Sequence, residues 1–180
     1  RDRNSLDAGA TRVDIHVNEI DEKYHFTIKD NGKGFTQETI ENYFAWFGAP
    51  HDEGDAIFGK FRLGRGQIFN YASTEWFSNQ FALKVDIEEA LNQKSDTLGF
   101  DFDEVKTSKI KGCEIKGIIY DKYGGDNFSV QYFKDDLKNI IENIDLPVYF
   151  NGELLNTPKR KIRATLKKGD ILFEDDLAYY

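Results

Sequence analysis

Hydrophobic and polar residues alternate along two short segments near the start of the chain, residues 13–17 and 24–28. Successive side chains of a β-strand point to opposite faces, so this alternation predicts two strands that each bury one face. The polar residues 18–22 between them suit a hairpin connection. We therefore expect an antiparallel hairpin within the first 30 residues.

A helical pattern follows this hairpin. Four apolar residues within residues 40–47 recur at the i, i+3, i+4, i+7 spacing of one helix face. Thr36 can cap the start of that helix, because its hydroxyl can accept a hydrogen bond from the first turn. This helix should pack on the sheet, and residues 133–144 show a second run at helical spacing.

The middle of the chain loses this periodicity. In residues 48–66, glycines and Pro50 accumulate beside charged residues, which is the composition of a long loop. Further along, the pattern predicts a short helix, several strands and an Asn-Gly turn. These lie at residues 67–73 (helix), 75–78, 81–87, 114–120 and 148–150 (strands), and 151–152 (turn).

The mixture of elements indicates an α+β fold. The chain shows no regular run of βαβ units. We expect a two-layer sandwich in which a mixed, mostly antiparallel sheet is covered by helices on one face. One domain should span residues 1–156. Residues 157–180, which begin basic and end acidic, should start a following module or form a C-terminal extension.

Composition narrows the class of protein. With 39% hydrophobic residues, a chain of 180 residues can bury one substantial core. A net charge of −8 argues against non-specific nucleic-acid binding by the whole surface. Cys113 is the only cysteine and no apolar run approaches the roughly 18 residues of a membrane span, so we expect a cytoplasmic protein without a membrane segment.

Three segments carry candidate chemistry. The first is Asp30-Asn31-Gly32-Lys33-Gly34-Phe35, which follows a predicted strand directly. A carboxylate at the end of a rigid strand, next to glycines that permit close backbone approach, suits the recognition of a flat base. Taken alone, the motif is equally compatible with a plain turn.

The second segment, Asn4-Ser5-Leu6-Asp7-Ala8-Gly9-Ala10, precedes the first strand and is typical of a helix that ends at Gly9. Asn4 offers a neutral oxygen, which suits Mg²⁺ because this ion binds mainly through nucleotide phosphates and few protein ligands. By itself, Asn4 fits an ordinary surface position better than a ligand.

The third segment is a glycine-spaced loop over residues 58–67 that runs into a predicted helix. Backbone N–H groups at a helix start can bind phosphate. It is not a Walker A loop, because no Gly-Lys-Ser/Thr sequence ends it.

Together and in this order, the three segments resemble the N box and the two glycine boxes of the GHKL ATPase superfamily, which has the Bergerat ATP-binding fold. The sequence of the second segment is most similar to that of heat-shock-chaperone-like and MutL-like members. The resemblance to the superfamily spans about residues 1–150. It implies ATP and Mg²⁺ as cofactors. It also implies that Asn4 holds Mg²⁺, that Asp30 accepts the adenine amino group, and that Gly32, Gly34, Asp7 and Ala8 line the adenine site.

The resemblance also assigns the phosphate site. Five residues, Gly59, Lys60, Arg62, Gly64 and Gly66, would surround the phosphates, and residues 48–58 would form the ATP lid. Many relatives have glycine at the position of Arg62. Either the loop therefore has a different conformation, or the Arg62 guanidinium binds phosphate. A third interpretation is that Lys60 and Arg62 are solvated surface cations.

Cys113 falls where the family commonly has a threonine that helps bind adenine through water. A thiol is a weaker hydrogen-bonding group than a hydroxyl, so this replacement should lower the affinity slightly. A buried strand cysteine without a ligand role is an equally good interpretation.

The resemblance implies an ATPase whose lid closure drives conformational change or dimerisation. The resemblance leaves open a homodimer partner and a downstream client protein or nucleic acid. The family's general base is a glutamate four residues before the N-box asparagine, which here would precede Arg1, so we expect the N-terminal part of the domain to lie outside this chain. Three alternatives stay open: a nucleotide-binding interaction module without hydrolysis, a histidine-kinase catalytic domain, and a non-nucleotide α+β domain.

Overall fold

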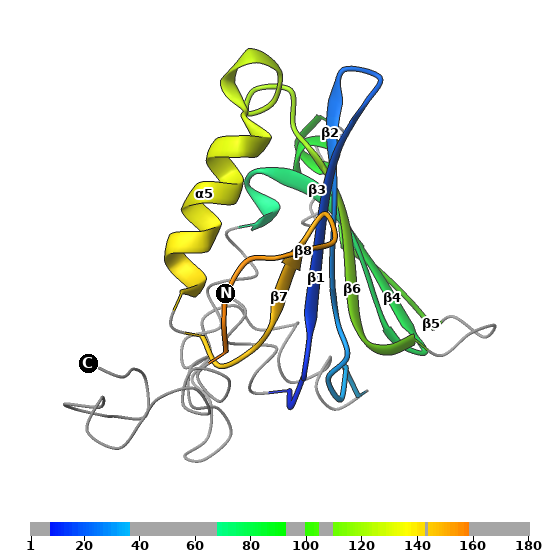
Figure 1. The fold of residues 1–180 in the computed structure, drawn as a ribbon. Helices are drawn as coiled ribbons and strands as arrows, with labels where there is room; N and C mark the ends of the chain where they lie inside the picture. The colour runs from blue at the N-terminus through cyan, green and yellow to red at the C-terminus, as the bar shows by residue number, and fades with distance from the viewer. Residues whose placement is uncertain (1–7, 37–67, 93–99, 105–109, 143, 159–180) are drawn as a thin grey trace, which may run out of the picture.

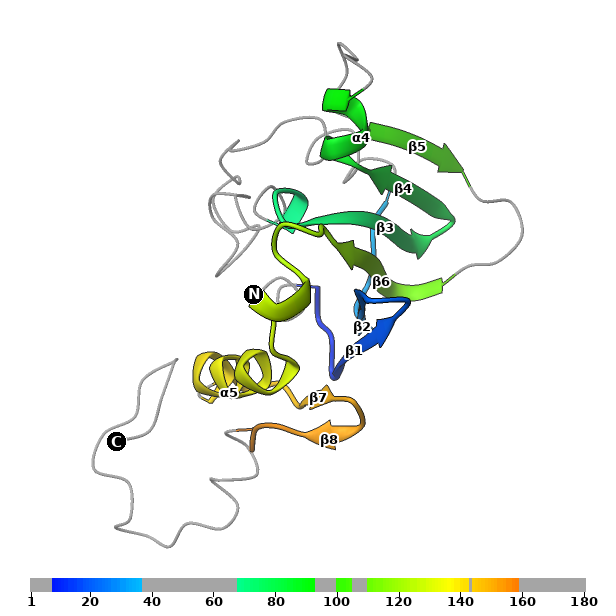
Figure 2. The ribbon, with the colours of Figure 1, turned by 90° about the horizontal axis from the view of Figure 1, so that it is seen from above.

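The computed structural model describes residues 8–36, 68–92, 100–104, 110–142 and 144–158. The strands within these ranges are β1 (Val13–Ile20), β2 (Lys23–Asp30), β3 (Ala72–Asn79), β4 (Phe81–Val85), β5 (Phe100–Glu104), β6 (Ile110–Ile119), β7 (Val148–Phe150) and β8 (Glu153–Leu154). They form one sheet in the order β5-β4-β3-β6-β2-β1-β7-β8 (Figures 1 and 2). Only the β1–β7 pair is parallel among these described strands.

The hairpin predicted near the start is confirmed, and its strands are longer than the alternation indicated. β1 and β2 pair antiparallel from Val13 opposite Asp30 to Ile20 opposite Lys23. The connecting residues Asp21 and Glu22 both have positive φ, at 51° and 61°. Such turns match the right-handed twist of the paired strands, which explains why the connection is so short.

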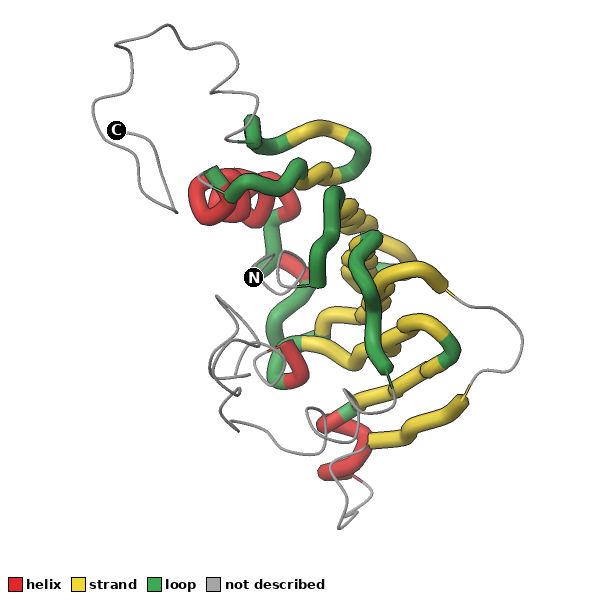
Figure 3. The backbone as a smooth tube through the Cα atoms, turned by 90° about the horizontal axis from the view of Figure 1, so that it is seen from below, coloured by secondary structure: helices red, strands yellow, loops and turns green. Residues whose placement is uncertain are grey.

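The longest described helix, α5 (Val130–Ile141), lies along one face of the sheet (Figures 1 and 3). Its Ser129 cap accepts a hydrogen bond from the Tyr132 N–H. Ile141 is fully buried among side chains of β1 and β7 such as Val13 and Val148. Val130 and Leu137 are partly buried against the same cluster, so the helix joins the sheet through one apolar side of its surface.

A second core lies on β3, β4 and β6. Trp76, only 6% exposed, is its centre and contacts the rings of Phe35 and Phe69 at centroid distances of 6.4 and 5.9 Å. Buried Phe81, Leu83, Val85 and Cys113 complete the cluster. Phe35 belongs to the segment after β2, so this core reaches the first glycine motif.

The predicted fold class is confirmed by this mixed, mostly antiparallel sheet with a helix on one face. The strand over residues 148–150 and the Asn151-Gly152 turn are also as predicted, with φ of 47° and 87° in the turn. α5 begins three residues before the predicted helix at 133–144 and ends at Ile141. The predicted helix at 40–47 and the loop over residues 48–66 lie outside the described residues.

Other predicted boundaries were wrong, and β3 begins at Ala72 rather than at residue 75. The helix expected over residues 67–73 is confined to residues 68–69 in the described part, because β3 starts at Ala72 and pairs with β6 from Ile119 onward. β4 ends at Val85, since Asp86 accepts the Glu89 N–H and thereby caps the short helix α4 (Ile87–Asn92). β6 starts at residue 110 rather than 114, and β5 and β8 were not predicted.

None of the described helices is both long and apolar enough to cross a membrane. The described part of the chain reaches Pro158, and its last buried residues include Leu155 and Asn156. A domain boundary at residue 156 stays a prediction.

Candidate functional site

Asp30, Cys113 and Ser78 form a row across three neighbouring strands. Asp30 ends β2 and stands opposite Cys113 of β6, which stands opposite Ser78 of β3. Directly opposed residues of antiparallel strands project from the same face of a sheet. Cys113 and Ser78 are buried, at 9% and 1% exposure, so the row lies on the face that carries the second core.

Two backbone N–H groups hold the turn after β2, and one of them binds the Asp30 side chain. The Gly32 N–H donates to Asp30 Oδ1 at 2.8 Å, and the Lys33 N–H donates to the Ala8 carbonyl at 2.9 Å. A Cβ added at Gly32 would come within 2.9 Å of the Ala8 Cβ. Three candidates from two sequence motifs, Ala8, Asp30 and Gly32, are therefore neighbours in space.

Gly34 lies in the left-handed region, with φ of 72°. A Cβ there would approach the Gly112 carbonyl and Ser78 Oγ to 2.7 Å, and Asn79 Nδ2 to 2.9 Å. Both the backbone conformation and this packing require glycine. The protein contacts supply a reason for Gly34 that does not depend on a nucleotide.

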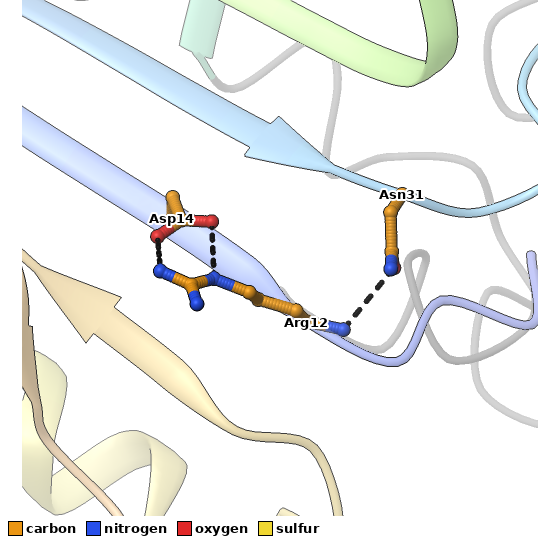
Figure 4. A network of polar contacts seen from close by, with 3 residues as sticks. All are labelled: Arg12, Asp14 and Asn31. Carbon is orange, nitrogen blue, oxygen red and sulfur yellow. Dashed lines mark hydrogen bonds and ion pairs between the residues drawn. The ribbon is translucent and has the colours of Figure 1, made fainter.

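Asn31 ties the same turn to the segment before β1. Its Oδ1 accepts the backbone N–H groups of Thr11 (2.8 Å) and Arg12 (3.2 Å), and its Nδ2 donates to Thr11 Oγ1 at 2.8 Å. Figure 4 shows the hydrogen bond between Asn31 and Arg12. The Arg12 guanidinium in turn makes two hydrogen bonds to Asp14, of 2.7 and 2.6 Å, which lower the pKa of Asp14. Arg12 also stacks 3.8 Å from the centre of the Tyr149 ring.

Two residues of β3 hold the far side of the turn. Ser78 Oγ donates to the Gly112 carbonyl and accepts the Phe35 N–H, both at 2.7 Å. Asn79 Nδ2 donates to the carbonyl oxygens of Lys33 (3.2 Å) and Phe35 (2.5 Å). Sequence reasoning missed Asn31, Ser78 and Asn79. Only Asn31 carried a signal, because asparagine side chains commonly bind backbone groups at turns.

Burial dominates the electrostatics at Cys113. It raises the pKa of the thiol, and the negative charges of Asp30 and Glu114 raise it further. The thiol is therefore neutral at physiological pH and can act as a weak hydrogen-bond donor.

Seven of the candidate residues lie outside the described part of the chain: Asn4, Asp7, Gly59, Lys60, Arg62, Gly64 and Gly66. The segment predicted to be the ATP lid, residues 48–58, lies outside it too. Among the residues that the structure describes, no group of three or more His, Cys, Asp or Glu side chains could hold a metal ion.

The sequence of the chain matches the family described as histidine kinase-, DNA gyrase B-, and HSP90-like ATPase over residues 3–109. This range covers more than half of the chain and includes all three motif segments, while Cys113 lies just beyond it. A search of curated proteins finds no match to the chain. The resemblance to the GHKL superfamily is thus confirmed: the chain belongs to the histidine kinase-, DNA gyrase B- and HSP90-like ATPase family and contains an ATP-binding domain of that family.

Proposed function

We propose that this domain binds Mg-ATP with the adenine at the end of β2, and that lid closure over the nucleotide drives a conformational change or dimerisation. The observation that carries the proposal is the convergence of Ala8, Asp30, Gly32 and Cys113 at one end of the central strands β2 and β6. These residues come from three separate parts of the chain. Their convergence is what a base-recognition site requires.

Asp30 has the chemistry to recognise the adenine amino group. An ionised carboxylate is an acceptor with about four lone-pair positions, so it can hold the Gly32 N–H and accept from a base as well. Its position at the end of a paired strand keeps the acceptor in one place. Cys113, opposite Asp30, is the second group that we assign to the base.

The phosphates and the metal ion would be held by residues assigned from the family resemblance. Asn4 would contribute one oxygen to Mg²⁺, whose remaining ligands would come from phosphates and water. The glycine-spaced loop over residues 59–66 would supply backbone N–H groups and the cations Lys60 and Arg62 to the phosphates.

Titration calorimetry with a non-hydrolysable ATP analogue and Mg²⁺ tests the adenine site. In Asp30→Asn, the new amide can still accept the Gly32 N–H, but it presents a donor to the adenine amino group. We expect wild-type protein to bind saturably and Asp30→Asn to lose at least about tenfold in affinity.

Asp121→Asn is the matched control. It removes one negative charge, as Asp30→Asn does, but just beyond the opposite end of β6. The Asp121 side chain is 81% exposed, and its ion pair with Lys23 is long, at 3.5 Å. Its affinity should equal that of the wild type. Equal binding by all three proteins would refute the adenine site at Asp30, and no binding by the wild type would refute the proposed function for this chain.

Hydrolysis separates the leading proposal from the alternative of a nucleotide-binding interaction module. The resemblance places the family's general base four residues before Asn4, so the assay uses a protein that includes that position. Mg²⁺-dependent phosphate release supports an ATPase that couples turnover to lid closure. Tight binding with no release supports the module without hydrolysis.

A further inference from the structure

Two consecutive residues of β3 reach the same loop, which a regular strand does not allow. Successive side chains of a strand point to opposite faces. Yet Ser78 binds the Phe35 N–H, and Asn79 binds the carbonyl oxygens of Lys33 and Phe35. The end of β3 is therefore shaped to hold the segment after β2.

The cause is an irregularity in the pairing of β3 with β6. Ser78 pairs with Cys113 but Asn79 pairs with Ile110, so Lys111 and Gly112 are additional residues on the β6 side. Asn79 itself has a φ of 52°, a conformation that costs energy for a residue other than glycine. Such bulges and strained residues re-aim side chains and are frequent beside functional sites.

Asn79 is connected to the Asp30 carboxylate through the loop after β2. The amide holds the carbonyl groups on both sides of Gly34. The same short loop contains Gly32, whose N–H donates to Asp30 Oδ1. Restraining residues 33–35 therefore restrains the group that orients the proposed adenine acceptor.

We propose that Asn79 is a positioning residue for nucleotide binding, which holds the loop after β2 in its binding shape before ATP arrives. This inference rests on the proposed function. A loop that is ordered in advance lowers the entropy lost on binding, so removal of the restraint should weaken affinity without removing any nucleotide contact.

The chain offers a close control in Asn151. It too has a positive φ, of 47°, and its side chain also binds backbone groups of a neighbouring segment, here the N–H and carbonyl of Val17. Val17 lies four residues along β1 from Val13, which is opposite Asp30. Asn151 therefore has the same local role at a place remote from the proposed site.

The test compares Asn79→Gly with Asn151→Gly, because glycine keeps the positive φ and removes only the amide. Both variants should have a lower Tm than the wild type. We expect Asn79→Gly to bind a non-hydrolysable ATP analogue about tenfold more weakly, while Asn151→Gly retains wild-type affinity. Equal affinities for the two variants would overturn the inference and leave Asn79 with a purely structural role.

Hydrogen exchange at the Gly32 amide separates this inference from the proposed function. Without nucleotide, exchange should be faster in Asn79→Gly than in Asn151→Gly, and unchanged exchange would contradict positioning even if the wild type binds no ATP. If Asn79→Gly does not fold, Asn79→Asp replaces it, since aspartate tolerates positive φ but cannot donate to the two carbonyl groups.

Discussion

Asp30 and Cys113 occupy directly opposed positions on β2 and β6, and the negative charge of Asp30 helps to keep the Cys113 thiol protonated. The pair joins a residue of the first glycine motif to one that lies more than 80 positions later in the sequence. It therefore offers a direct way to test whether the two act on one ligand.

Replacing Cys113 with threonine should tighten ATP binding by roughly fivefold, because a hydroxyl is a better hydrogen-bonding group than a thiol. Calorimetry with a non-hydrolysable analogue measures the change. Cys113→Val is the control, since valine has the shape of threonine without the hydroxyl. Equal affinities of the threonine and valine variants would exclude a hydrogen bond from this position to the nucleotide or its water.

Cys113 should also make stability depend on pH in the alkaline range. The pKa of its thiol is raised above the ordinary value of 9.0 in the folded protein, so above that pH the unfolded chain binds fewer protons than the folded one. The free energy of unfolding should then fall as pH rises, by up to about 1.4 kcal/mol per pH unit. Below that pH the contribution is fully present and constant.

Urea denaturation of the wild type and Cys113→Ser between pH 7 and roughly pH 10 isolates this effect from other titrating groups. The stability of the wild type should decline relative to that of the serine variant. Parallel pH profiles would mean that the thiol is not buried as the structure shows.

Gly34→Ala should destabilise the domain by about 3 kcal/mol, because alanine is strained at positive φ and its Cβ would meet three neighbouring groups. Gly125→Ala is the matched control. Gly125 has a similar φ of 59° but no atom within 4 Å of an added Cβ, so it should lose only about 1 kcal/mol. Equal losses in urea denaturation would show that the loop around Gly34 is not packed against Ser78 and Gly112.

Asn156 links the end of α5 to β7 and should be a major determinant of stability. It is 6% exposed, donates to the carbonyl groups of Ile141, Ile144 and Leu146, and accepts the Val148 N–H. Asn156→Ala leaves these groups without their partner and should cost about 3 kcal/mol in free energy of unfolding. The exposed Asn139→Ala on α5 should change stability little, and a similar cost for both would contradict this role.

Local patterns predicted several elements correctly. The β1–β2 hairpin, α5, β7 and the Asn151-Gly152 turn all follow from periodicity or turn residues. In each, neighbouring residues share one buried face, so the spacing along the chain carries the information. The boundaries of β3 and β6 were missed because pairing with distant strands, rather than local pattern, extends them.

For the site, the motifs identified Ala8, Asp30, Gly32, Gly34 and Cys113, and the structure brings these five together at one end of the central strands β2 and β6. Ser78 and Asn79 were not predicted. A serine and an asparagine at the end of a strand give no signal in the sequence, and their partners in the turn after β2 lie more than 40 residues earlier.

The sequence by itself determined the family, the α+β class and the residues that we assign to adenine, because these depend on motifs and on short-range periodicity. Only the tertiary structure decided how the turn after β2 is held. That restraint comes from backbone groups of the segment before β1, from the side chains of Ser78 and Asn79 on β3, and from the Gly112 carbonyl of the β6 bulge. Contacts between such distant segments exist only once the sheet has assembled.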